Sequence, residues 1–381
     1  MNRRRFLAAL GITSALAGCL GDDPPVAGDG DGSEPVETTT TGARGGSQPT
    51  SAGGFDLPIP EDELRRGAPK DAIPAITAPV YSDDWSGFDE VNVELEDSFE
   101  VVGVELDGIA RAYPLAILNW HEIVNDTFDG RPVVVTYCPL CGSAVVADRL
   151  VQGEPTYFGV SGFLWMSDLV MYDDRTNSLW SQVLATAIRG ELTGDTLSLL
   201  PATITTWGEW KASHPDTGVL VPPPVSGTIR GRQTRRYEVN PYTSYQQSRQ
   251  IGIFNDEADD RMHPKTSVVG VTADGVARAY PFDSVSSAGV VNDDVGTLPV
   301  VVAATADGTL AAYVRRVDGN TVEFERDGDV LVAEGSQWDI VTGRAIDGPH
   351  EGTVLTRAND RSPMFWFAWA DFNPGTEIYG E

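Results

Sequence analysis

Two cysteines separated by two residues form the motif Cys138-Pro139-Leu140-Cys141, which carries the sharpest chemical signal in the sequence. A gap of this length lets both sulfurs reach one metal ion. The same spacing also suits thiol–disulfide exchange, and a structural disulfide is a third interpretation for a chain outside the cytoplasm. Among these, metal binding is the favoured hypothesis.

Several other side chains could complete a metal site beside the two thiolates. Imidazoles are ligands for zinc and copper, and a thioether beside thiolates favours Cu(I) over harder ions. A Cys₂His set with an open position could equally hold zinc. Only the thioether therefore favours copper. The expected metal ligands are Cys138, Cys141, His121, His214 and Met166, with Met171 as a second thioether.

Thiol–disulfide exchange is the second hypothesis, and the predicted local structure weakens it. Motifs of the thioredoxin type place the first cysteine at a helix N-terminus, whereas residues 142–146 predict a strand. If the site is catalytic, the candidates are Cys138, Cys141, His121 and, as a base, Glu122. A disulfide closing so short a loop would contribute only ~2 kcal/mol. No hydrolase motif, phosphate loop or dinucleotide fingerprint is found, so no nucleotide cofactor is expected.

The elements that position these residues occur twice, because the sequence contains an internal duplication. Residues 101–114 recur as 268–281 with eleven identities in fourteen positions. The offset is 167 there and has shrunk to 158 where Trp180 matches Trp338. The first copy therefore carries an extra segment, which we place at residues 161–168.

Comparing the copies separates the residues that the fold needs from those that one copy needs for itself. The second copy has lost each cysteine and histidine of the expected site, because Ala288, Thr305, Gly308 and Asn373 stand where the first copy has His121, Cys138, Cys141 and His214. We therefore expect the first copy to hold the site and the second copy to be a scaffold.

Each copy is predicted to be rich in strands. An Asp-Gly turn divides residues 101–113 into two strands, and Pro114 is well placed to open a short helix. Further strands are expected over 133–146 and 157–180, with a second short helix over 205–213. The expected fold is β-rich α+β with short helices, in two tandem homologous units. These units span 85–218 and 267–381, and residues 219–266 connect them.

The N-terminus has the pattern of an export signal. Arg3-Arg4-Arg5 has the charge of a twin-arginine signal, and the apolar stretch that follows is too short to span a bilayer. Leu16-Ala17-Gly18-Cys19 then resembles a lipoprotein cleavage site. We expect a cleaved signal over 1–18, a lipid on Cys19 and a tether over 19–54, whose composition does not favour folding. The expected location is extracytoplasmic, with the membrane contacted through the lipid alone.

The charge of the chain restricts its environment and partners. Fifty-six acidic residues face twenty-seven basic ones, which gives a formal net charge of −29. The acids are spread along the chain, so their repulsion would be screened only in concentrated salt. This composition is typical of a halophilic source, and it argues against nucleic acid as a partner.

Three sequence runs resemble one known family. They are NWHEIVND, TYCPLCGSA and TWGEWKASHPDT, at residues 119–126, 136–144 and 206–217. The resemblance is to the family catalogued as domain of unknown function 3179, and it extends over about residues 85–380. It implies membership of that family and no particular reaction, so the chemistry must be inferred from the residues.

Overall fold

The computed structural model describes residues 51–91, 93–257 and 259–381. They belong to one compact unit, which spans Ser47–Glu381. The expected signal over 1–18, the expected lipid at Cys19 and nearly all of the expected tether lie outside the described residues. The last residues of the expected tether, 51–54, form β1 (Ser51–Ala52) and the turn of a small hairpin, whose second strand is β2 (Phe55–Asp56).

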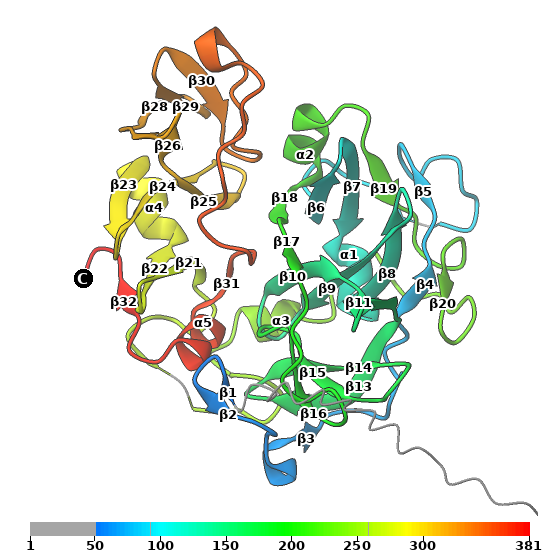
Figure 1. The fold of residues 1–381 in the computed structure, drawn as a ribbon. Coiled ribbons are helices and arrows are strands. Elements are labelled where there is room, and N and C mark those ends of the chain that lie inside the picture. The colour runs from blue at the N-terminus through cyan, green and yellow to red at the C-terminus, as the bar shows by residue number, and fades with distance from the viewer. Residues whose placement is uncertain (1–50, 92, 258) are drawn as a thin grey trace, which may run out of the picture. The chain divides into compact units, whose positions relative to one another are not determined.

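Three sheets of the described chain are built mainly from the first copy (Figure 1). One contains β18 (Thr203–Thr206), β6 (Glu100–Leu106), β7 (Ile109–Pro114), β19 (Gly218–Leu220) and β5 (Tyr81–Ser82). The next contains β17 (Leu199–Leu200), β10 (Ser143–Asp148), β9 (Arg131–Cys138), β8 (Ile123–Phe128), β4 (Ile76–Ala78) and β20 (Gly227–Thr228). The third contains β16 (Thr186–Arg189), β15 (Leu179–Ser181), β14 (Asp168–Asp173), β13 (Phe158–Trp165) and β3 (Arg65–Arg66).

Three more sheets are built from the second copy. They contain β31 (Met364–Phe365), β21 (Ser267–Ala273), β22 (Val276–Pro281) and β32 (Glu377–Ile378); then β23 (Val290–Val295), β24 (Leu298–Ala304) and β25 (Leu310–Val314); then β28 (Glu325–Asp327), β29 (Val330–Ala333) and β30 (Ser336–Asp339). Two further hairpins pair β11 (Leu150–Val151) with β12 (Glu154–Pro155) and β26 (Arg316–Val317) with β27 (Asn320–Thr321).

These six sheets are blades in a β-propeller arrangement, so the expected α+β class was wrong. Helix accounts for only 12% of the structure. The expectation of two tandem units was wrong as well, because each copy supplies three blades of one ring. The hydrophobic core shows why: one cluster combines Trp180 of the first copy with Trp366 and Phe367 of the second. A single copy would leave that apolar surface exposed to water.

The described helices are short and lie between strands. They are α1 (Leu115–His121), α2 (Trp207–Ser213), α3 (Thr243–Gln246), α4 (Phe282–Ala288) and α5 (Trp366–Phe372), with 3₁₀ turns at Glu61–Glu63 and Gly348–His350. Helix α1 begins directly after Pro114, as predicted. Helix α2 is capped by Thr206, whose hydroxyl oxygen accepts the Glu209 N–H at 3.3 Å. None of the helices in the described residues has the length and apolarity to cross a membrane.

The duplication is visible in matching contacts. Arg111 forms an ion pair with Asp126 at 2.6 Å, and Arg278 forms the equivalent pair with Asp293 at 2.6 Å. Each arginine is on the second strand of a hairpin and each aspartate is on the strand after a short helix. The two halves therefore share one framework, and a difference between them has a local cause.

Candidate metal centre

The two cysteines face each other across a tight turn. Strand β9 ends at Cys138 and β10 begins at Ser143, as the predicted strand over 142–146 requires. The Cys141 N–H donates to the Cys138 sulfur at 3.4 Å. The turn residue Gly142 has a positive φ of 61°, and a Cβ there would lie 2.8 Å from the ring of Phe365. Both cysteines are free and buried, so the turn holds two thiols away from solvent.

A carboxylate that the sequence comparison did not single out completes the cluster. A carboxylate oxygen of Asp168 and the sulfurs of Cys138 and Cys141 all lie within 4.8 Å of one another. Asp168 opens β14, directly after a turn in which Met166 and Ser167 have φ values of 52° and 64°. Two successive left-handed residues are typical of a tight hairpin turn. This turn brings the Ser167 carbonyl oxygen to 3.4 Å from the Cys141 sulfur and 3.9 Å from the Cys138 sulfur.

Burial sets the protonation of this cluster. It raises the pKa of Asp168 to about 7, although the carboxylate accepts hydrogen bonds from the Ser181 hydroxyl at 2.6 Å and from the Val183 N–H at 3.3 Å. Burial also raises the pKa of the Cys141 thiol well above its ordinary value, with the neighbouring Cys138 as the next cause. A cation among these groups would favour their ionised forms, because it would offset the lost solvation.

His121 lies outside the cluster. Its Nδ1 lies 2.8 Å from the Pro74 carbonyl oxygen and its Nε2 lies 2.9 Å from the Tyr237 hydroxyl. The ring is fully buried, and this burial lowers its pKa to about 4. Both nitrogens have protein partners, so His121 is a neutral, satisfied core histidine in this structure.

The connector, residues 219–266, contacts two side chains of the first copy that the second copy lacks, Trp120 and His121. The Trp120 indole N–H donates to the Val239 carbonyl at 3.2 Å, and Tyr237 bonds to His121. Tyr245 donates its hydroxyl to the Leu140 carbonyl, inside the cysteine turn, at 2.9 Å. The connector thus packs along the first copy's motif and covers the cysteine turn. Trp120 and His121 hold it in place.

Glu122 is the unusual member of this motif. It ends α1 with a positive φ of 56°, where the second copy has Gly289 with φ 78°. Glutamate rarely adopts this conformation, whereas glycine does so at no steric cost. Burial raises the pKa of Glu122 to about 8. No hydrogen bond of its carboxyl group is found among the described residues, so it is not held as an ion-pair partner.

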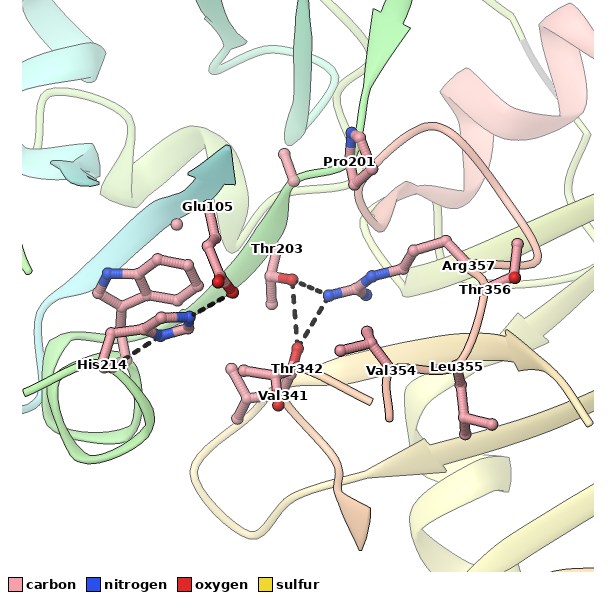
Figure 2. A pocket seen from close by; sticks show the side chains of 13 residues that line it. Glu105, Pro201, Thr203, His214, Val341, Thr342, Val354, Leu355, Thr356 and Arg357 are labelled. Atoms are coloured by element: carbon pink, nitrogen blue, oxygen red, sulfur yellow. Dashed lines mark hydrogen bonds and ion pairs between the residues drawn. The ribbon is translucent and has the colours of Figure 1, made fainter. Parts of the chain in front are cut away.

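His214 lies outside the cluster as well, and the two methionines lie on or beside β14. His214 stacks on Trp210 with ring centroids 3.8 Å apart, and it faces Glu105 in a separate pocket (Figure 2). Met166 lines a cavity of about 340 Å³ together with Asp371. Met171 is buried in the core of its sheet. Neither expected histidine therefore lies with Cys138 and Cys141 in this cluster.

Asp168 could have been found from one sequence signal, the shrinking offset between the copies. It is the last residue of the extra segment placed at 161–168. That segment is the end of the β13–β14 hairpin and its turn. Acidic residues are so common in this chain that Asp168 had no other mark.

A comparison with known families identifies the family of this chain. The model of the family described as "Protein of unknown function (DUF3179)" matches residues 70–376. The chain belongs to this family. The resemblance inferred from the three runs is therefore confirmed. No curated protein and no solved structure matches the chain.

Proposed function

We propose that this DUF3179 protein binds one divalent transition-metal ion, zinc in preference to copper, through Cys138, Cys141 and Asp168. The observation that carries the proposal is the mutual approach of these three buried donors within 4.8 Å. Buried charges of one sign are costly unless a counter-charge is present, and a metal ion supplies it.

The distances around the Ser167 carbonyl oxygen support a fourth ligand. Zn–S bonds of about 2.3 Å and Zn–O bonds of about 2.1 Å place sulfur and oxygen about 3.6 Å apart on a tetrahedron. The Ser167 oxygen lies 3.4 Å and 3.9 Å from the two sulfurs, on either side of that value. Two sulfurs, one carboxylate and one carbonyl make a closed, buried set. Such a set is typical of a metal that is held permanently.

Charge favours a divalent ion. Two thiolates and one carboxylate carry three negative charges. A divalent ion would neutralise two of them and leave one. The half-buried Arg361 guanidinium donates to the Val183 carbonyl at 2.6 Å and interacts electrostatically with Asp168, so it can offset the remaining charge. Cu(I) would leave two negative charges. The preference for copper rested on a thioether beside the two thiolates, whereas this set of two sulfurs, one carboxylate and one carbonyl oxygen contains no thioether.

Metal analysis of protein purified anaerobically in concentrated salt tests the proposal. We expect stoichiometric zinc in the wild type and none in the Cys138→Ser/Cys141→Ser double variant. Asp168→Asn keeps the volume of the side chain and removes its charge, so it should lower the zinc content or affinity. His121→Gln is the matched control and should keep its zinc. Zinc lost in His121→Gln and kept in Asp168→Asn would contradict this set of ligands.

Thiol–disulfide exchange is the second candidate, favoured by the Cys141 N–H that donates to the Cys138 sulfur. Such a hydrogen bond stabilises a thiolate, which is the reactive form of cysteine. Thiol titration of the same preparation separates the two functions. Free thiols that oxidise and reduce reversibly without bound metal would support exchange. A permanent disulfide without metal would contradict both functions and leave a structural bridge.

The cellular setting is part of the same proposal. The twin-arginine pattern and Cys19 support export and lipid anchoring outside the cytoplasm, and the net charge of −29 supports a saline environment. A folded precursor could acquire its metal before export. Cys19→Ser should shift the protein from the membrane fraction to the medium, as measured by fractionation of cells expressing each form. Equal membrane retention of both forms would contradict the lipid anchor.

A further inference from the structure

A second pocket of about 290 Å³ lies between the two halves (Figure 2). Glu105, Trp210 and His214 line it from the first half, and Val341, Leu355 and Arg357 line it from the second. None of these residues belongs to the metal cluster. The pocket therefore needs an explanation of its own.

The duplication supplies a twin pocket with which to compare it. That pocket has a volume of about 220 Å³ and contains Gly270 and Trp369 where the first contains Gly103 and Trp210. A Cβ added to either glycine would lie 2.2 Å from its tryptophan ring. Both indoles donate to a threonine hydroxyl at 2.9 Å. The two pockets therefore share one wall, which is made by the glycine and the tryptophan.

The polar groups of the two pockets differ. Glu105 and His214 of the first pocket are replaced by Thr272 and Asn373 in the twin. Because the wall is retained, the fold itself does not require Glu105 and His214. They belong to the chemistry of the first pocket.

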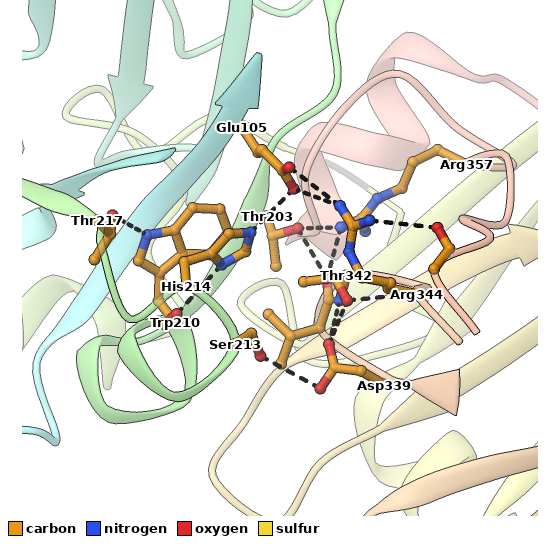
Figure 3. Close-up of polar contacts among 12 residues, drawn as sticks. Glu105, Thr203, Trp210, Ser213, His214, Thr217, Asp339, Thr342, Arg344 and Arg357 are labelled. Atoms are coloured by element: carbon orange, nitrogen blue, oxygen red, sulfur yellow. Dashed lines mark hydrogen bonds and ion pairs between the residues drawn. The ribbon is translucent and has the colours of Figure 1, made fainter. Parts of the chain in front are cut away.

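The negative charge of Glu105 is already compensated by protein groups (Figure 3). Its carboxylate lies 3.1 Å from His214 Nε2 and accepts the Arg344 guanidinium at 3.1 and 3.2 Å. Glu105 thus has partners from both halves, and it adds little net charge to the pocket.

Arg357 is the cation without such compensation. Its Nη2 donates to the Val341 carbonyl at 2.8 Å and to the Thr203 hydroxyl. Within the described residues it has no carboxylate within ion-pair distance, and its Nε and Nη1 make no hydrogen bond. Its guanidinium lies over the ring of Tyr313, 4.8 Å from the centroid. In a chain with a net charge of −29, this pocket presents a locally positive group.

We propose that this pocket binds a small organic carboxylate, whose anionic end pairs with the free edge of Arg357. A guanidinium and a carboxylate match in geometry and charge. The apolar wall, which includes Val354 and Leu355, suits a short hydrocarbon body. The volume lies near the lower end for ligand pockets, which favours a small acid. This site does not depend on the proposed metal.

Calorimetric titration with propionate tests the proposal, with sodium propionate replacing sodium chloride so that ionic strength stays constant. Wild-type protein should bind propionate, and Arg357→Gln should weaken this binding about tenfold or more. Arg316→Gln, on an exposed hairpin strand, makes the same change in net charge and should bind as the wild type does.

A second variant guards against a simple loss of folding in Arg357→Gln. Val354 is exposed at the rim of the pocket, so Val354→Trp should fill the pocket while Arg357 and the core remain intact. It too should abolish propionate binding. The proposal is overturned if wild-type protein does not bind propionate, or if both variants bind as tightly as the wild type. Inorganic phosphate bound at Arg357 in place of propionate would also overturn it.

Discussion

The two halves of the ring differ most at one hairpin. Trp180 pairs with Met171 in the first half, and Trp338 pairs with Leu331 in the second. Counting from these equivalent pairs, the second hairpin turns directly after Asp327↔Val330. The first continues for two more pairs, Leu164↔Leu169 and Trp165↔Asp168. This extension brings the Ser167 carbonyl and Asp168 to the cysteines.

The opposing turn shows the complementary difference. In the second half the Thr305 N–H donates to the Thr309 carbonyl at 2.9 Å, and the Thr309 N–H donates to the Thr305 hydroxyl at 3.0 Å. That turn is held by hydrogen bonds between its own threonines and contains no cysteine. The proposed site therefore depends on one longer hairpin and two cysteines, within a framework that both halves share.

If the framework is shared, its equivalent tryptophans should matter equally. Trp210→Ala and Trp369→Ala each remove a buried indole that packs on a glycine, so each should lower the free energy of unfolding by about 3–5 kcal/mol. Denaturant unfolding in concentrated salt measures both. A lower free energy of unfolding in only one of the two variants would show that the two halves do not share this framework.

A bound metal should stabilise the protein through donors that only the first half has, Cys138, Cys141 and Asp168. Free zinc at a hundredfold excess over its dissociation constant should add about 2.7 kcal/mol to the free energy of unfolding. A chelator should remove this gain in the wild type and have no effect on Cys138→Ser/Cys141→Ser. Melting temperatures with and without chelator check this. A chelator effect that persists in the double variant would place the metal elsewhere.

Contacts with the connector should also contribute to the free energy of unfolding, and only the first half makes them. Tyr237→Phe removes the hydroxyl that lies 2.9 Å from the buried His121 Nε2, and should cost about 1–3 kcal/mol. The same substitution at Tyr157, which is exposed, serves as the control. Hydrogen exchange along residues 237–246 should quicken in Tyr237→Phe alone. Equal effects of the two substitutions would show that the connector is not held through His121.

The burial of Glu122 predicts an effect on stability that depends on pH. Burial raises its pKa from 4.5 to about 8, so between these values the folded protein holds a proton that the unfolded chain releases. Its contribution to stability is full below pH 4.5 and is lost as the pH rises through 8, with a slope of at most about 1.4 kcal/mol per pH unit.

Glu122→Gln cannot ionise, so its free energy of unfolding should fall less steeply than that of the wild type between pH 5 and about 8. Denaturant unfolding at a series of pH values measures the two slopes. Parallel slopes for the two proteins would mean that Glu122 is ionised in the folded state.

Much of the framework could be predicted from the sequence, because it rests on local signals. The Asp-Gly turns, the helix after Pro114 and the Thr206 cap depend on neighbouring residues. The assembly of strands into complete sheets does not. It depends on pairings such as Val101 with Thr205 and Arg111 with Gly218, which join residues about a hundred positions apart.

The same distinction explains the candidate site. The paired cysteines are a local motif, and subtraction between the copies marked the half in which Cys138, Cys141 and Asp168 come together. It also marked Trp120 and His121, because the connector packs on one copy only, at Pro74, Tyr237 and Val239. Asp168 joins the cysteines through the turn of the β13–β14 hairpin, more than 25 positions further along the chain. No local pattern indicates this contact.

X-ray absorption at the zinc edge, on anaerobically purified protein, reports the ligands of the bound metal. A centre of Cys138, Cys141, Asp168 and the Ser167 carbonyl predicts two sulfur neighbours at about 2.3 Å and two oxygen neighbours at about 2.0–2.2 Å, without the multiple scattering of an imidazole. The oxygen shell should change in Asp168→Asn and stay the same in His121→Gln. A histidine signal in the wild type, or the absence of a bound metal, would contradict a Cys138–Cys141–Asp168 centre.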